Sequence, residues 1–188
     1  MILLVLPDIP AEDRLLERAR QGDRDAVGEI YDQYFEAIFQ FIRLRVEDPA
    51  LAEDLASEVF MKLVTSLNGR NAPRKTLRGW LFRVARNLLH DHYSGSQYLN
   101  ETVLDEWLPA PDHEQPESTV FAVLDARRVR RALRMLADDQ QEVLLLRFGQ
   151  ALSLQETADI MGKRVGAVKS LQFRATNRLR DLLEGMAG

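Results

Sequence analysis

Two clusters of basic, aromatic and amide side chains give this chain its clearest chemistry, which is the binding of phosphates and bases. The first cluster lies in RNAPRKTLRGWLFRVARN, residues 70–87, which holds six Arg or Lys residues and no acidic residue. Cations neutralise backbone phosphates and interleaved aromatic or amide groups receive unstacked bases, so this segment suits single-stranded or melting DNA. Its candidate DNA-binding residues are Arg70, Asn71, Lys75, Arg78, Trp80, Arg83, Arg86 and Asn87. For Trp80 taken alone, core packing is the simpler interpretation.

The second cluster lies in SLQETADIMGKRVGAVKSLQFR, residues 153–174, which has the pattern of a helix, a tight turn and a second helix. Ser153 and Glu156 have the spacing of a capping box, and Gly162 can end the first helix in a left-handed conformation. In such a unit the second helix enters the major groove of DNA. The alternative is an ordinary amphipathic helix pair with a solvated basic face. The candidate duplex-binding residues are Arg164, Lys169, Ser170, Gln172, Phe173, Arg174 and Arg178.

A third group of side chains precedes the first cluster and has the opposite charge. In DPALAEDLASEVFMKLV, residues 48–64, an acidic stripe is expected opposite a leucine-rich helix face. Such a stripe could dock a basic partner helix, although a charge run is more often only a solvated face. Its position directly before the basic segment favours docking. The candidate partner-binding residues are Glu53, Asp54, Ser57, Glu58 and Phe60.

Helices are expected to position all three groups, because apolar residues recur at helical spacing on both sides of the middle of the chain. No strand-like alternation of useful length is present, so the predicted fold class is all-α. In the N-terminal half we expect helices over 13–20, from Asp23 or Asp25 to beyond Phe41, from Pro49 to about Leu67, and from the cap Thr76 to about Tyr93. In the C-terminal half we expect helices over 120–136, 139–147, 154–161 and 166–183, with Asp138 or Asp139 capping the second of them.

The middle of the chain separates these helices into two groups. Residues 97–126 contain seven acidic residues and no Lys or Arg, and prolines punctuate them. This composition predicts a flexible linker. Residues 127–183 contain 12 basic and six acidic residues, although the whole chain has a net charge of −4. We therefore predict two small helical domains, 1–96 and 120–188, joined by an acidic, Pro-containing linker at 97–119, with the basic C-terminal domain suited to phosphate.

Several classes of function lack the residues that they need. The chain has no cysteine, and it has no Gly-rich phosphate loop, nucleophile elbow or catalytic triad pattern. His90 and His92 are not followed by a further ligand set, so we expect no metal, no cofactor and no enzymatic activity. The apolar start, MILLVLPDIP, is short and interrupted by Pro7. We expect neither a signal peptide nor membrane insertion, and therefore a cytoplasmic protein.

This combination of segments resembles bacterial RNA polymerase sigma factors of the extracytoplasmic-function (ECF) type. The resemblance is carried by AEDLASEVF at 52–60, LRGWLFRVARNLLHDHY at 77–93, DQQEVLLLR at 139–147 and residues 153–180. It implies that 52–60 binds the clamp helices of core RNA polymerase. It also implies that residues 1–96 form a region 2 domain that melts and reads the −10 promoter element, and that residues 120–188 form a region 4 domain that reads the −35 element. An anti-sigma factor is a further implied partner.

Two positions depart from the family pattern. Phe173 stands where a polar or basic group is usual, and Ser57 stands where glutamine is frequent. The main alternative function is a stand-alone helix-turn-helix regulator that binds duplex operators, with residues 1–96 as a sensor or dimerisation domain. An enzyme with a DNA-binding tail is a third interpretation, but it lacks a catalytic constellation. The basic segment beside an acidic helix favours a transcription initiation factor, because a simple operator-binding protein needs neither feature.

Overall fold

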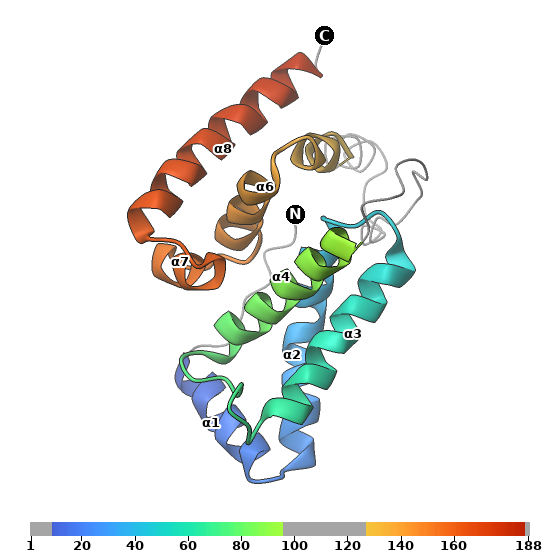
Figure 1. Cartoon of the computed structure of the whole chain (residues 1–188), viewed down its shortest axis with the longest axis vertical. Helices are drawn as coiled ribbons and strands as arrows, with labels where there is room; N and C mark the ends of the chain where they lie inside the picture. Colours follow the sequence, from blue (N-terminus) through green and yellow to red (C-terminus); the bar gives the residue numbers. More distant parts are fainter. Residues whose placement is uncertain (1–8, 96–126, 187–188) are drawn as a thin grey trace, which may run out of the picture.

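The computed structural model describes residues 9–95 and 127–186, and within these ranges every regular element is a helix (Figure 1). The prediction of an all-α fold is therefore confirmed. The helices of the first range are α1 (Ile9–Arg20), α2 (Arg24–Arg43), α3 (Pro49–Ser66) and α4 (Leu77–Gly95). The second range begins with a helix over 127–134 and continues with α6 (Asp138–Leu144), the π-helical turn η1 (Leu145–Gly149), α7 (Leu154–Met161) and α8 (Val165–Gly185). The predicted linker at 97–119 lies outside the described residues.

Side-chain caps set the starts of the N-terminal helices much as the sequence predicts. Asp23 accepts hydrogen bonds from the backbone N–H groups of Asp25 and Ala26, so it is Asp23 that caps α2. Asp48 caps α3 by accepting a hydrogen bond from the Ala50 N–H at 2.9 Å, and Pro49 follows it in the first turn, where its missing N–H costs nothing. The Thr76 hydroxyl accepts a hydrogen bond from the Gly79 N–H at the start of α4. Each of these caps satisfies backbone donors that a helix start leaves without a partner.

The core of the N-terminal half is built around α2, which packs against α1, α3 and α4. The side chains of Ile30, Ile38 and Phe41 on α2 are fully buried. Phe82 of α4 is also fully buried, and its ring meets that of Phe41 edge to face with centroids 5.4 Å apart. This packing gives α3 and α4 fixed positions, so the side chains on their outer faces are presented by a rigid base.

The helix-turn-helix prediction is confirmed in its local detail. The Ser153 hydroxyl accepts from the Glu156 N–H, and the Glu156 carboxylate accepts from the Ser153 N–H, which completes the capping box. Gly162 ends α7 with φ at 64°, a left-handed conformation that strains any residue with a Cβ atom. Ala158 on α7 and Val168 on α8 are both buried. The two helices are thus held at a crossing that leaves the outer face of α8 open.

Two predictions about the C-terminal half are wrong in detail. Neither Asp138 nor Asp139 caps α6: the N-cap residue is Ala137, which makes no side-chain cap bond, and both aspartates lie in the first helical turn. Negative charge in that turn still stabilises the helix through its dipole. The predicted helix over 139–147 is α-helical only to Leu144 and continues as the π-helical turn η1. Of the helix expected over 120–136, the structure describes residues 127–134 as helical.

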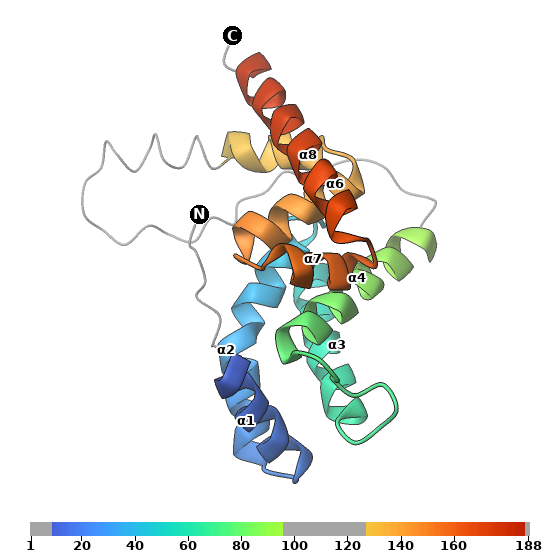
Figure 2. The same ribbon diagram turned by 90° about the vertical axis from the view of Figure 1, so that its left-hand side faces the viewer.

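The two halves of the molecule lie in contact with each other. Helix α7 packs against α4, and η1 packs against α2, so the C-terminal helices cover part of the N-terminal group (Figures 1 and 2). Helix α8 extends away from this contact toward the C-terminus. The three groups of candidate residues therefore lie on α3, on the loop before α4 with α4 itself, and on α8.

Candidate nucleic-acid and protein interfaces

The acidic stripe lies on the exposed face of α3, as the sequence predicts. The side chains of Glu53, Asp54, Ser57 and Glu58 are all exposed. Glu58 pairs with Lys62 one turn later, at 3.2 Å. Two large apolar residues continue this face toward the end of the helix: Met61 is 64% exposed and Val64 is 49% exposed. Negative charge beside exposed apolar area suits a partner helix that is both basic and amphipathic.

Phe60 differs from the other residues of this group because its side chain is buried. Its ring packs edge to face on Tyr31 of α2, with centroids 5.0 Å apart, and lies 6.1 Å from Phe35. Tyr31 itself stacks on Phe35 at 4.8 Å and remains 40% exposed. Phe60 therefore anchors α3 to α2, and Tyr31 is the aromatic residue that reaches the surface. Sequence reasoning missed Tyr31, although the four-residue spacing of Tyr31, Phe35 and Phe39 on α2 was a visible signal.

The loop between α3 and α4 carries the first part of the basic segment. Arg70, Asn71 and Lys75 are exposed on it. Trp80 is half-buried, and its indole Nε1 donates to the Asn71 carbonyl at 2.7 Å, which ties the loop to α4. On the other side of the loop, the Arg20 guanidinium donates a hydrogen bond to the Pro73 carbonyl. Trp80 thus combines core packing with positioning of the loop, so the two interpretations of this residue are not exclusive.

The basic residues on and just before α4 meet acidic groups of the C-terminal half. Lys75 Nζ lies 2.9 Å from the Asp159 carboxylate, and Arg83 donates to the Asp159 carbonyl at 2.7 Å. The bond from Lys75 is the main cause of a lowered pKa for the Asp159 carboxyl. Asp159 lies on α7, so this helix is held at two points, one on the loop before α4 and one on α4 itself. Asn87, further along α4, is exposed.

Two more arginines of α4 are engaged in partly buried ion pairs. Arg78 Nε lies 2.7 Å from the fully buried Glu12 carboxylate and 3.3 Å from the carboxylate of Glu156. Arg86 Nε lies 2.7 Å from Glu142 of α6, whose side chain is 3% exposed. Burial raises the pKa of both Glu12 and Glu142, and the neighbouring arginines counteract that rise. Sequence reasoning missed all of these acidic partners.

The outer face of α8 carries most of the predicted duplex-binding residues. Lys169, Arg174 and Arg178 are exposed, and Phe173 is 69% exposed. Arg164 is exposed at the N-cap position of the helix. Ser170 is exposed as well, and its hydroxyl donates to the Gly166 carbonyl at 3.1 Å.

Gln172 is half-buried and differs from its neighbours on α8. Its side-chain oxygen accepts a hydrogen bond from Arg147 Nε of η1 at 3.1 Å. Arg147 also donates to the Leu152 carbonyl, in the connection that leads to α7. Arg147 thus links the π-helical turn to α8, a role that sequence reasoning missed because the two residues are 25 positions apart.

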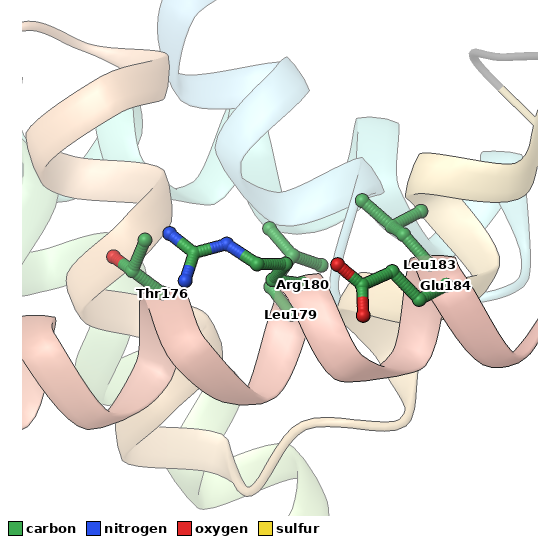
Figure 3. A pocket seen from close by; sticks show the side chains of 5 residues that line it. All are labelled: Thr176, Leu179, Arg180, Leu183 and Glu184. Atoms are coloured by element: carbon green, nitrogen blue, oxygen red, sulfur yellow. The ribbon is translucent and has the colours of Figure 1, made fainter.

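The C-terminal half of α8 bears a shallow groove with an apolar floor. Its lining residues are Thr176, Leu179, Arg180, Leu183 and Glu184 (Figure 3). A second cleft lies where the end of α4 faces the start of α6, and charged groups such as Arg45, Arg86 and Asp138 line it. Within residues 9–95 and 127–186, no three His, Asp or Glu side chains are grouped so that they could hold a metal ion. No helix in the described part of the chain is long and apolar enough to cross a membrane.

Comparison with known proteins identifies the family. Residues 30–97 match the family model for Sigma-70 region 2, and residues 132–181 match the model for Sigma-70, region 4. RNA polymerase sigma factor YlaC of Bacillus subtilis is 30% identical over 161 residues, which cover 84% of this chain and 91% of YlaC. ECF RNA polymerase sigma factor BldN of Streptomyces coelicolor is 41% identical over 170 residues. The chain belongs to the ECF sigma factors. The BldN match covers 90% of this sigma factor but 64% of BldN.

Solved structures show the same fold. CnrH, determined in complex with the cytosolic domain of CnrY, has a TM-score of 0.71 at 24% identity, covering 93% of this sigma factor and 98% of CnrH. The sigma factor RpoE from Bartonella quintana, determined with the anti-sigma factor NepR, has a TM-score of 0.65 at 24% identity, covering 84% and 96% of the two chains.

Proposed function

We propose that this sigma factor binds core RNA polymerase through α3 and directs it to promoters by reading two DNA elements with separate surfaces. One observation carries the proposal: an exposed acidic stripe, a basic loop with its helix and an exposed basic helix of a helix-turn-helix occur in one chain on three different surfaces. A stand-alone operator-binding protein would need only the last of these. The factor itself performs no bond chemistry in this proposal, because the polymerase supplies it.

The core-binding surface in this proposal is the exposed face of α3. Glu53, Asp54, Ser57 and Glu58 supply the charged and polar contacts, and Met61 adds apolar area. The partner expected from the family is the pair of clamp helices on the largest polymerase subunit. Phe60 would not contact the partner directly, but it fixes the position of α3 by packing on the aromatic rings of α2.

The −10 surface in this proposal is the basic loop together with α4. Arg70 and Asn71 are exposed on the loop and would meet an unstacked base and its phosphates, and Trp80 holds the loop in position. The other candidates are Lys75 at the end of the loop and, along the helix, Arg78, Arg83, Arg86 and Asn87, of which Lys75, Arg83 and Asn87 are exposed. Cationic side chains on a fixed helix would follow the phosphates of a separated strand.

The −35 surface in this proposal is the outer face of α8. The N-terminal part of the helix would enter the major groove, with Arg164, Lys169 and Arg178 available for phosphates. Phe173 and Arg174 are the candidates for contacts with base edges. Arg174 would bind a guanine, and Phe173 would contact the methyl group of a thymine. The hydrogen bond to Arg147 would hold Gln172 in a fixed orientation beside them.

The remaining parts of the proposal follow from membership of the family. We place the region 2 domain at 1–96, the acidic linker at 97–119 and the region 4 domain at 120–188. An anti-sigma factor is an expected partner that would control access to the polymerase-binding surfaces. The cytoplasm is the expected location, because core polymerase and promoter DNA are found there.

Reconstitution tests this function directly. The purified chain is mixed with core RNA polymerase, and binding is measured before promoter-dependent transcription on genomic fragments. Stable association with core and transcripts with defined start sites are the expected results. If the chain binds duplex DNA alone but does not bind core, the operator-binding alternative replaces the proposal.

A further inference from the structure

Helix α1 contacts the loop that is proposed to take an unstacked base of the −10 element. This loop, residues 67–76, joins α3 to α4 and passes beside α1 (Figure 1). The match to the Sigma-70 region 2 model begins at residue 30, so α1 lies outside the matched residues. We infer that α1 positions the −10 loop, with Arg20 and Glu12 as its two positioning residues. The inference rests on the proposed function and adds a second element to that site.

At the end of α1, Arg20 contacts the loop through both its side chain and its backbone. The guanidinium donates to the carbonyl of the buried Pro73, and the Arg20 carbonyl accepts from the Asn68 side chain at 3.3 Å. These two contacts lie on either side of the segment that carries Arg70 and Asn71. A single residue of α1 therefore fixes the part of the loop that would meet the base.

A buried carboxylate of α1 fixes the first turn of α4, where the loop ends. Glu12 Oε1 lies 2.7 Å from Arg78 Nε, and Glu12 Oε2 accepts from the Arg78 N–H at 3.4 Å. The Glu12 side chain is fully buried, and a buried carboxylate is costly unless it is paired. This pair therefore specifies how α1 docks on α4. Together with the bond from Trp80 to the Asn71 carbonyl, it holds the second half of the loop.

A loop held in this way does not have to be ordered when DNA binds. The backbone carbonyls of Asn71 and Pro73 are engaged by α4 and α1, whereas the side chains of Arg70 and Asn71 are exposed. Preorganisation removes an ordering cost from binding and so raises affinity. It also sharpens the discrimination between bases, because side chains held in one geometry contact only the base that matches them.

A nitroxide label tests the positioning in the free protein. The chain has no native cysteine, so the label can be attached on the loop at the exposed position Arg70→Cys. Arg20→Met removes the donor to the Pro73 carbonyl and should narrow the lines of the label's spectrum, because the loop becomes more mobile. Arg20→Lys keeps a donor and should restore the broader lines. The matched control is Arg14→Met, which makes the same charge change at an exposed position of α1. Equal mobility in Arg20→Met and Arg14→Met would overturn the inference.

Base discrimination by the holoenzyme separates positioning from general destabilisation. The unlabelled full-length variants are assembled with core polymerase and titrated with fluorescent fork-junction DNA from a promoter found by reconstitution. Four versions of this probe differ in one base of the single-stranded −10 element. We expect Arg20→Met to bind the preferred base roughly fivefold more weakly than Arg14→Met, with little change for the other three, since fewer loops hold the binding geometry. A loss of equal size for all four bases would show that Arg20 only supports the fold, and it would overturn the inference.

Stability and failure of the proposed function are read separately. If Arg20→Met lowers the urea midpoint, Asn68→Ala repeats both comparisons from the exposed loop side, because it removes the donor to the Arg20 carbonyl. A wild-type chain that binds neither core polymerase nor any promoter would refute the proposed function. The label comparison needs neither core nor DNA, so it would still decide whether α1 holds the loop.

Discussion

Replacing Arg86 with methionine should weaken the contact between the two halves by about 2 kcal/mol. The Glu142 side chain is 3% exposed, and its carboxylate lies 2.7 Å from Arg86 Nε. Removing one partner of a fully buried ion pair costs about 3–5 kcal/mol, because the remaining charge stays buried without it. The Arg86 side chain is 28% exposed, and Arg45 also attracts the carboxylate. Both facts reduce the expected cost to about 2 kcal/mol.

The comparison that isolates this pair is a double-mutant cycle with Glu142→Gln. The amide keeps the shape of the side chain and removes its charge, so Glu142→Gln alone should cost about 1 kcal/mol or less. The double variant should be more stable than Arg86→Met alone, because it no longer buries a carboxylate. Urea unfolding followed by circular dichroism gives the free energy of unfolding of all four proteins. The dependence of that free energy on urea concentration should be the same in each, which checks that the transitions are comparable. If the two single costs simply add, to within about 0.5 kcal/mol, the pair does not couple the halves and the reasoning fails.

Acidification provides an independent check on the same variant. Burial raises the pKa of the Glu142 carboxyl above its usual 4.5, and loss of Arg86 should raise it further. A carboxyl with a raised pKa contributes stability that is complete below the unfolded value and is lost as the pH rises through the folded value. The cost of Arg86→Met should therefore shrink as the pH falls from about 7 to about 5. The pKa of Asp159 is lowered, so its contribution to stability is lost as the pH falls, which is the opposite direction. The quantity to compare across pH is therefore the difference in unfolding free energy between Arg86→Met and the double variant.

Three further predictions concern separate surfaces. Asp54→Arg should weaken core binding without changing the urea midpoint, whereas the same reversal at the exposed Asp32 of α2 should leave core affinity unchanged; equal effects would make the stripe a merely solvated face. Arg174→Ala should lower promoter affinity of the holoenzyme by about 1–3 kcal/mol if it contacts a base, and a loss that is uniform across sequences would assign it to phosphate. Gly162→Ala should destabilise the fold by about 1–2 kcal/mol in urea, because φ there is 64°; an unchanged midpoint would show that the turn relaxes.

Structural features that depend only on residues close together in the sequence could be predicted from it. The capping box and the left-handed Gly162 depend on contacts within four positions, and both are found as expected. The start of α6 shows where local reasoning ends. Two consecutive aspartates fit either the cap or the first turn, and the choice depends on which residue has the extended backbone. That residue is Ala137, at φ −62° and ψ 148°, so both aspartates fall inside the helix.

The ion pairs that cover α4 could not be predicted in this way. Lys75 and Asp159 are 84 positions apart, and the connection between the two halves passes through a long acidic segment. Nothing in the local pattern distinguishes Asp159 from any other solvated carboxylate on an amphipathic helix. The sequence did carry one coarse signal, the basic segment at 70–87 without a single acidic residue. Such a segment needs an acidic partner, and the pattern does not say whether that partner is DNA or another part of the same chain.

Two adjacent residues of α8, one polar and one apolar, differ in how the structure holds them. The Gln172 side chain accepts a hydrogen bond from Arg147, which fixes its orientation in the free protein. Phe173 is 69% exposed, which is costly for an aromatic ring in water. A polar or basic residue at that position would be solvated at no such cost, and it would read a donor or acceptor on a base edge. The ring can offer only apolar contact, and the thymine methyl group is the apolar feature of the major groove. We therefore expect the −35 preference of this sigma factor to depend on a thymine opposite Phe173.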